Sequence, residues 1–255
     1  MRKLFTLASL VALTMVACTN EEPKGEANEK GQVHFDLNIS NEVDVTRANV
    51  SCTTPAAEDF TLKIEGVDHT YSKEYTNIAE FNEDGYLHLG SYKATVAAGN
   101  IAEEGYDKAT FVGGEEFSVE ARKQTDVNIT ATIANAMVKV ETTENFRNYF
   151  VGGHSLELTT AVGNKFDVSA QSEPLFIAPA AFTVNGTAVK QANQSGAEGA
   201  TITLPEYKME MAEAQTLYTV KFDVKDAGRA TLEITLNETL VESINIEQEL
   251  NDNAQ

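Results

Sequence analysis

Side chains that could carry out chemistry are few and scattered along this chain. The four histidines, His34, His69, His88 and His154, lie far apart in the sequence, so a metal site could arise from them only by coincidence of folding. No Gly-x-Ser-x-Gly elbow, no Gly-Lys-Ser/Thr phosphate loop and no His-Glu-x-x-His pair occurs. Cys52 has no activating motif beside it that would make a nucleophile pair with His69. We therefore expect no catalytic residue, no metal and no cofactor.

Two acidic or amide-rich segments have the composition of calcium loops. Asn82–Gly85 and Gly163–Asn164 carry oxygen-bearing side chains beside glycine, but neither has the full ligand spacing of a calcium loop. Turn chemistry explains both segments. With 39 Asp and Glu in the chain, no single carboxylate pair can be selected as a glycosidase site. We expect that the protein is not an enzyme.

The first residues have the composition of an export signal. Met1–Lys3 is basic, Leu4–Val16 is an apolar run, and Val16-Ala17 places apolar or small residues just before a cysteine. A basic start, a short apolar segment and a small-residue cleavage site predict a secretory signal over 1–17, too short to span a bilayer as a stable helix.

Cys18 follows that signal directly and resembles the lipobox cysteine of bacterial lipoproteins. The resemblance implies that Cys18 is diacylated and becomes the mature N-terminus, a stable membrane anchor because several acyl chains share one residue. The acidic stretch Thr19–Glu22 looks like the signal that sends Bacteroidetes lipoproteins to the outer surface, although a plain polar linker is the alternative. We expect residues 18–30 to be a lipidated tether at the outer membrane of a bacterium.

Composition restricts the partners. The net charge is −20, which argues against nucleic acid, because phosphates attract a basic surface. The same charge argues against electrostatic docking on anionic lipid, so the acyl group would do the anchoring. The chain has two cysteines and hence no disulfide framework once Cys18 is lipidated, so its stability must come from a hydrophobic core.

Alternating apolar residues predict many short strands. Val33, Phe35, Leu37 and Ile39 alternate with polar residues, which is the period of a strand with one buried face. The same period recurs around 60–64, 87–89, 92–96, 117–119, 127–133, 138–140, 156–158, 217–224, 232–236 and 244–246. Short strands with turns between them predict an all-β protein built from immunoglobulin-like or transthyretin-like sandwiches.

Turn and helix signals fall between these runs. Glycine-containing pairs predict turns at Asp84-Gly85, Gly99-Asn100, Gly113-Gly114, Gly152-Gly153 and Gly163-Asn164. Asn185-Gly186 is the strongest hairpin signal, because this dipeptide suits positive φ angles. Short helices are predicted only around Glu144–Phe150 and Lys208–Ala214.

Two domains are expected in tandem, an N-terminal sandwich over 31–135 and a C-terminal sandwich over 136–255. The junction Ile133–Met137 contains no flexible linker, so a strand of the first sandwich should lead straight into the second. A close junction favours a fairly rigid rod.

Several stretches together resemble a family of Bacteroidetes lipoproteins that is catalogued as a domain of unknown function and is fimbrillin-like in style. These stretches are Gly31–Leu37, Val45–Ala48, Asp59–Ile64, Leu89–Val96, Phe111–Gly114, Ala134–Val140 and Val224–Leu232. The resemblance implies surface display and two sandwich domains, and it implies no catalytic residues.

Within that resemblance, Thr46-Arg47-Ala48 is a candidate processing site. In fimbrillins, which polymerise into pili, a comparable arginine after the first strand is cut by an arginine-specific protease. Cutting between Arg47 and Ala48 would remove the anchor together with the strand Val33–Ile39, and a strand from a neighbouring subunit could replace it. The alternative is a static lipoprotein that is never cut at Arg47.

The sequence thus favours a surface lipoprotein with a structural or adhesive role. The alternative is a glycan-binding accessory lipoprotein of a nutrient-uptake system, which would need aromatic platforms for sugar rings. The chain has no Trp. Its candidate platform residues are Tyr71, Tyr75 and Tyr149, for which packing at the edge of a sandwich is the simpler explanation.

Overall fold

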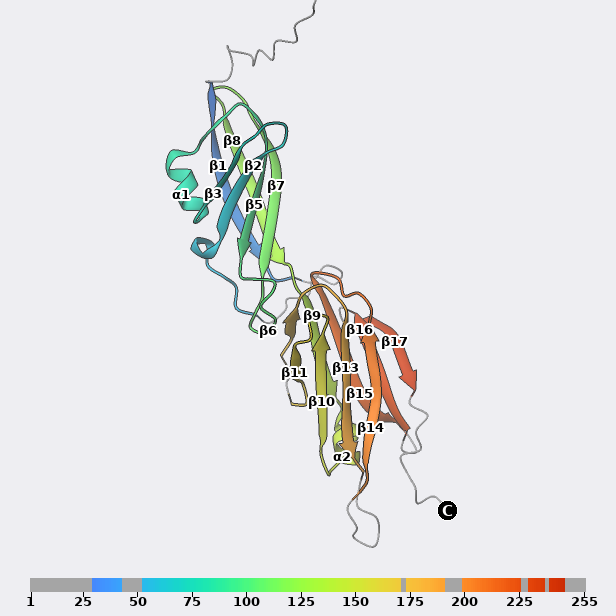
Figure 1. The fold of residues 1–255 in the computed structure, drawn as a ribbon. Helices are drawn as coiled ribbons and strands as arrows, with labels where there is room; N and C mark the ends of the chain where they lie inside the picture. Colours follow the sequence, from blue (N-terminus) through green and yellow to red (C-terminus); the bar gives the residue numbers. More distant parts are fainter. Residues whose placement is uncertain are drawn as a thin grey trace, which may run out of the picture.

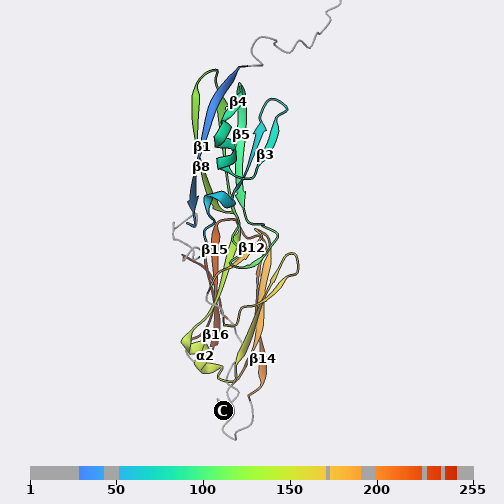
Figure 2. The same cartoon turned by 90° about the vertical axis from the view of Figure 1, so that its left-hand side faces the viewer.

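The computed structural model describes residues 29–42, 52–170, 173–190, 199–225, 229–236 and 239–245. These residues form an all-β protein with two bodies, here called the N-terminal lobe and the C-terminal lobe, arranged end to end (Figure 1). Each lobe has its own hydrophobic core. The elongated shape is also plain in the view turned by 90° (Figure 2).

The N-terminal lobe is one seven-stranded sheet folded over on itself, in the order β3-β2-β5-β7-β8-β1-β4. Its strands are β1 (Lys30–Ser40), β2 (Thr61–Gly66), β3 (Ser72–Tyr75), β4 (Tyr86–His88), β5 (Gly90–Ala98), β7 (Phe111–Val119) and β8 (Gln124–Ile133). A 3-10 helix, η1 (Ala57–Asp59), and α1 (Ile78–Asp84) lie between strands.

The fold in this sheet lies between β7 and β8. These two strands pair only at Phe111 and Val112 and then diverge, which separates the layer β3-β2-β5-β7 from the layer β8-β1-β4. Gly113 lies at the crossing, where a Cβ atom would come within 2.5 Å of the carbonyl oxygen of Thr130. The predicted turn at Gly113-Gly114 is therefore wrong, because the glycines allow two strands to cross closely rather than reverse one chain.

The C-terminal lobe is a sandwich of two sheets with the orders β11-β10-β13-β14 and β17-β16-β15-β9-β12-β6. The first sheet contains β10 (His154–Thr160), β11 (Lys165–Asp167), β13 (Phe182–Val189) and β14 (Thr201–Met209). The second contains β9 (Ala136–Thr142), β12 (Leu175–Ile177), β15 (Thr216–Lys225), β16 (Arg229–Leu236), β17 (Thr239–Asn245) and β6 (Gly105–Tyr106). The predicted helix at Glu144–Phe150 is confirmed as α2 (Glu144–Tyr149).

Two local predictions in this lobe are wrong. Asn185-Gly186 lies inside β13, paired with β10 and β14 around a register shift, and neither residue has a positive φ. The segment predicted as a helix at Lys208–Ala214 begins in β14 and continues without helical structure. The long-range pairing of β13 and β14 outweighs both local signals.

The two lobes meet at a junction, here called the waist, which contains the end of β8, the start of β9, and β6 paired with β12. β8 ends at Ile133 and β9 begins at Ala136, so only Ala134 and Asn135 separate them, as the junction predicted. In addition, β6 comes from the loop between β5 and β7 but pairs with β12, as an added strand of the C-terminal sheet. The division into domains 31–135 and 136–255 stays a prediction, and Gly105–Tyr106 crosses it.

Side chains cross the waist as well. Met137 and Phe176, from strands of the C-terminal lobe, are fully buried in the N-terminal core. The Glu104 carboxylate accepts hydrogen bonds from the Thr160 hydroxyl (2.7 Å), the Asn164 amide (2.9 Å) and the backbone nitrogen of Ala178 (3.0 Å). The waist is therefore packed and hydrogen-bonded on both sides, which favours a stiff rod.

Candidate functional site

The first strand is the element that the predicted cut between Arg47 and Ala48 would remove. β1 pairs in parallel with β8 from Gln32 to Ser40, and antiparallel with β4 only from Lys30 to Gln32. It therefore lies inside its layer, between two neighbours. Its loss would leave the whole length of β8 without a partner on that side.

The inward face of β1 is the one that the sequence predicts. Val33 and Phe35 are fully buried, and Leu37 and Ile39 are partly buried against the same core. All four side chains thus face the core, with Leu37 and Ile39 closer to solvent than Val33 and Phe35.

Phe35 is one member of a closed circuit of aromatic side chains in the N-terminal core. Its ring meets Phe81 at 5.0 Å and Phe117 at 5.4 Å between centroids, both edge to face. The circuit continues from Phe117 to Tyr92, Tyr71, Tyr75 and back to Phe81. Removing β1 would leave a slot at Phe35 that is lined by aromatic rings from α1 and β7.

Tyr71 and Tyr75, two of the candidate platform residues, belong to this circuit. Their hydroxyl groups are 3.2 Å apart, and Tyr75 is buried while Tyr71 is half-buried. Burial, helped by the hydrogen bond to Tyr75, raises the pKa of Tyr71 well above its ordinary value. Both rings pack edge to face against neighbouring rings. Tyr149, the third candidate, is half-buried in the C-terminal lobe beside Phe150.

A helix that the sequence analysis missed holds the outer edge of β1. The Asn82 side chain accepts a hydrogen bond from the Phe35 backbone nitrogen (3.1 Å) and donates one to the Phe35 carbonyl oxygen (3.0 Å). The Val33 nitrogen donates to the carbonyl oxygen of Gly85 (2.6 Å). The end of α1 therefore takes the place of a neighbouring strand where β4 stops.

The signal for α1 was present in the sequence. Asn77 caps its first turn by accepting a hydrogen bond from the Glu80 nitrogen, and Gly85 ends it in the left-handed conformation with φ 60°. The turn predicted at Asp84-Gly85 is thus the end of a helix, and the Asn82 side chain binds the backbone of Phe35. Within the described residues no group of three or more His, Cys, Asp or Glu could hold a metal ion.

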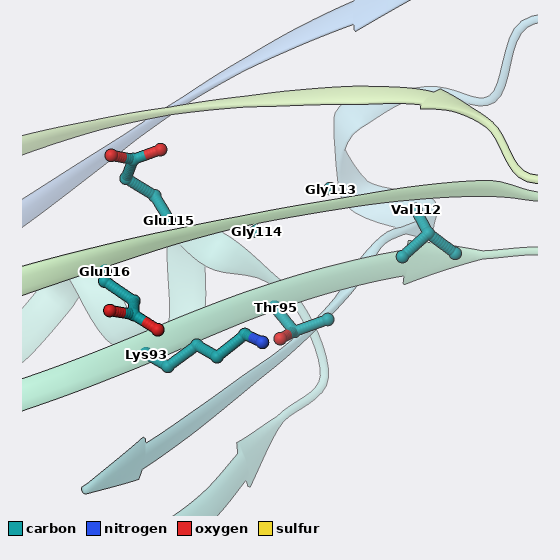
Figure 3. Close-up of a pocket in the computed structure, with 7 residues that line it drawn as sticks. All are labelled: Lys93, Thr95, Val112, Gly113, Gly114, Glu115 and Glu116. Carbon is teal, nitrogen blue, oxygen red and sulfur yellow. The ribbon is translucent and has the colours of Figure 1, made fainter. Parts of the chain in front are cut away.

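A shallow hollow on the outside of the same lobe lies over β5 and β7, where Gly113 and Gly114 present no side chains (Figure 3). Glu115 and Glu116 point to opposite sides of β7, and Lys93 lies beside Glu116 (Figure 3). In the described part of the chain, β8 does not pair with this stretch of β7. Glu115 is exposed beside this unpaired stretch of β7, where a charged side chain disfavours pairing with a foreign strand.

Three predicted site residues lie outside the described residues: Cys18, and Arg47 with Ala48. Cys52 packs against the N-terminal core. Burial, with Asp107 nearby, raises the pKa of the Cys52 thiol, which disfavours the reactive thiolate. None of the described helices is long and apolar enough to cross a membrane.

Comparisons with known proteins place the chain in a family. No curated protein matches its sequence. A fimbrial assembly protein from Parabacteroides distasonis is 12% identical, with a TM-score of 0.49 over 86% of this chain and 100% of that one. The fimbrial anchor protein Mfa2 from Porphyromonas gingivalis is 9% identical, with a TM-score of 0.41 over 84% of this chain and 100% of that one. The sequence profile of the DUF4493 family matches residues 29–252, so the chain belongs to this family, described as a domain of unknown function.

Proposed function

We propose that this protein is a lipid-anchored structural or adhesive protein of the bacterial outer surface, with no catalytic role. The observation that supports this proposal most strongly is the waist. There β6, from the connection between β5 and β7, pairs with β12 of the C-terminal lobe, and the Glu104 carboxylate accepts hydrogen bonds from three donors of that lobe. A rod stiffened in this way suits a protein that holds one end away from a membrane.

The direction of the chain supports this role. Lys30 begins β1 at the end of the N-terminal lobe that is remote from the waist, since β8 runs parallel to β1 and ends at the waist. The 11 steps from Cys18 to Glu29 span at most about 40 Å. A lipid on Cys18 would therefore lie at the N-terminal end of the rod, and the C-terminal lobe would face outward.

The anchor is tested by replacing Cys18 with Ser, which removes the thiol that accepts diacylglycerol. We expect the mature membrane-bound form to disappear, measured by metabolic labelling with a fatty acid and by fractionation of the membranes. Cys52→Ser is the matched control and should leave lipidation unchanged. A correctly processed Cys18→Ser protein at the wild-type level on the cell surface would refute the anchor.

Strand replacement after cleavage at Arg47 is the finer form of this proposal. Three features of β1 support it. The strand lies between β8 and β4, the Phe35 ring packs against aromatic rings of the core, and the Asn82 side chain accepts a hydrogen bond from the Phe35 backbone nitrogen. A strand from another subunit would find these contacts prepared. A static, uncut lipoprotein is the alternative, and a comparison of the stability and mass in solution of the chains 48–255 and 19–255 distinguishes the two.

The glycan-binding function receives less support from the geometry. A sugar needs an open ring face, but Tyr75 is buried, and Tyr71 and Tyr149 are half-buried against other rings. We therefore give the structural and adhesive role precedence.

A further inference from the structure

A second hollow, of about 470 Å³, lies in the C-terminal lobe beside the far half of β9. Val140, Glu141 and Thr142 of β9 line one side, His154 and Ser169 line the other, and Arg147 of α2 lies at the end. The hollow is remote from β1 and from the waist, so it belongs to neither feature already described.

The hollow exposes an unpaired stretch of strand edge. β12 pairs with β9 only from Ala136 to Val138. On its other side, β9 is paired with β15 as far as Thr142. In the part of the chain that the structure describes, no strand continues the line of β12 along β9 past Val138.

The register shows which backbone groups face the hollow. The Thr143 nitrogen donates to the Phe222 carbonyl oxygen of β15, and successive residues of a strand direct their N–H and C=O groups to alternate sides. Val138, Val140 and Thr142 therefore direct theirs away from β15. Val138 meets β12, whereas the N–H and C=O groups of Val140 face the hollow, and buried backbone groups require partners.

A cationic side chain closes the end of this edge. Arg147 donates to the Thr142 carbonyl oxygen and to its Oγ1 at 3.2 Å. Its guanidinium has five donors in a fixed fork, so others remain for a ligand. Of the nearby acids, Glu141 pairs with Lys139 at 2.6 Å, and Asp223 accepts a hydrogen bond from the Thr143 hydroxyl. The Arg147 guanidinium therefore favours an anionic group at this end of the hollow.

The opposite wall is fixed in place. The His154 Nε2 lies 3.1 Å from the Ser169 carbonyl oxygen, and its ring packs edge to face on Phe146 at 5.3 Å. The hollow thus combines a rigid wall, a free strand edge and a guanidinium about two residues, or roughly 7 Å, along the strand from Val140.

We propose that this hollow is a docking site for an extended, carboxylate-bearing peptide of a partner protein. The peptide backbone pairs with the Val140 N–H and C=O groups as an added strand, and a carboxylate about two residues away binds the Arg147 guanidinium. This site gives the outward-facing lobe a specific partner class, and it does not depend on cleavage at Arg47 or on the lipid at Cys18.

The test uses the purified full-length protein and the acetylated peptide Thr-Val-Thr-Val-Glu, followed by backbone amide NMR shifts. We expect the Val140 and Thr142 amide signals to move on titration. Arg147→Gln should weaken binding by about tenfold or more, and Arg147→Lys, which keeps the charge but loses the fork, should weaken it less. Arg122→Gln removes an equal charge from the N-terminal lobe and should leave binding unchanged.

Two further probes separate strand pairing from capture of a charge alone. Two peptides, N-methylated at the two alternate sets of amides, should differ in affinity. The peptide that loses the N–H groups facing β9 should bind about tenfold more weakly, because it can no longer donate to the strand edge. Equal binding of both methylated peptides, or equal Arg147-dependent binding of glucuronate, would overturn the proposal in favour of a simple carboxylate or acidic-sugar site. Unmoved Val140 and Thr142 signals at millimolar peptide would overturn it, as would dimerisation that Arg147→Gln abolishes.

Discussion

The side-chain oxygen of Asn135 lies 2.6 Å from the backbone nitrogen of Thr110 and accepts its hydrogen bond inside the fully buried waist. The backbone of Asn135 also accepts a hydrogen bond from the Gln215 nitrogen, and the Ala134 nitrogen donates to the Thr110 carbonyl oxygen. One short linker therefore ties the β6–β7 connection to the start of β15.

Replacing Asn135 with Ala should lower the free energy of unfolding by about 1–3 kcal/mol, because the buried Thr110 N–H loses its acceptor. Chemical denaturation followed by circular dichroism measures the change. Asn128→Ala, at an exposed position of β8, is the control and should cost less than about 0.5 kcal/mol. Equal effects of the two substitutions would show that the waist bond is dispensable.

The two lobes should unfold together rather than one after the other. Met137 and Phe176 fill the N-terminal core from the C-terminal strands, so unfolding either lobe exposes apolar surface of the other. Calorimetry should give one transition for the wild type. Glu104→Gln should lower the free energy of unfolding by about 1–2 kcal/mol, because three charge-assisted hydrogen bonds weaken. Glu103→Gln, on the same loop but exposed, should change it little. Two separate wild-type transitions would contradict the coupling.

Gly186→Ala should destabilise the C-terminal lobe by more than about 1 kcal/mol, because of a steric clash rather than turn geometry. A Cβ at Gly186 would lie 2.2 Å from the carbonyl oxygen of Ser155 on the neighbouring strand β10. Thermal melting measures the effect. Thr187→Ala, at the exposed next position of β13, should change the melting temperature little. A wild-type melting profile for Gly186→Ala would mean that β10 and β13 lie farther apart.

The chain 48–255, which lacks β1, should be much less stable than 19–255, or should associate. Val33 and Phe35 alone bury apolar surface worth roughly 3–6 kcal/mol, a large part of the 5–15 kcal/mol typical of a folded protein. Melting temperature and mass in solution test this. Phe35→Ala should cost about 3–5 kcal/mol, while the exposed Asp36→Ala should cost little. A monomeric 48–255 with an unchanged melting temperature would remove the driving force for strand replacement and leave the static lipoprotein.

Local periodicity determined much of this fold from the sequence alone. The alternation of Val33, Phe35, Leu37 and Ile39 predicted both the strand and its buried face, because side chains of a strand alternate between its two sides wherever its partners lie. The Asn77 cap and Gly85 also encode α1 locally, although the alternating strands on either side concealed it. The candidate residues Cys18, Arg47 and Ala48 are sequence predictions that stay untested, since they lie outside the described residues.

Only the tertiary structure decided the remaining features, because they depend on which segments meet. Asn185-Gly186 encodes a hairpin turn, yet β10 and β14 pair with it as the middle of a strand. Gly105–Tyr106 is a strand only because β12 lies opposite it in the other lobe. The edge of β9 beside Arg147 is open because β12 pairs with β9 only as far as Val138. Pairing between distant segments satisfies backbone hydrogen bonds that no local pattern can assign, so these features could not be predicted from the sequence.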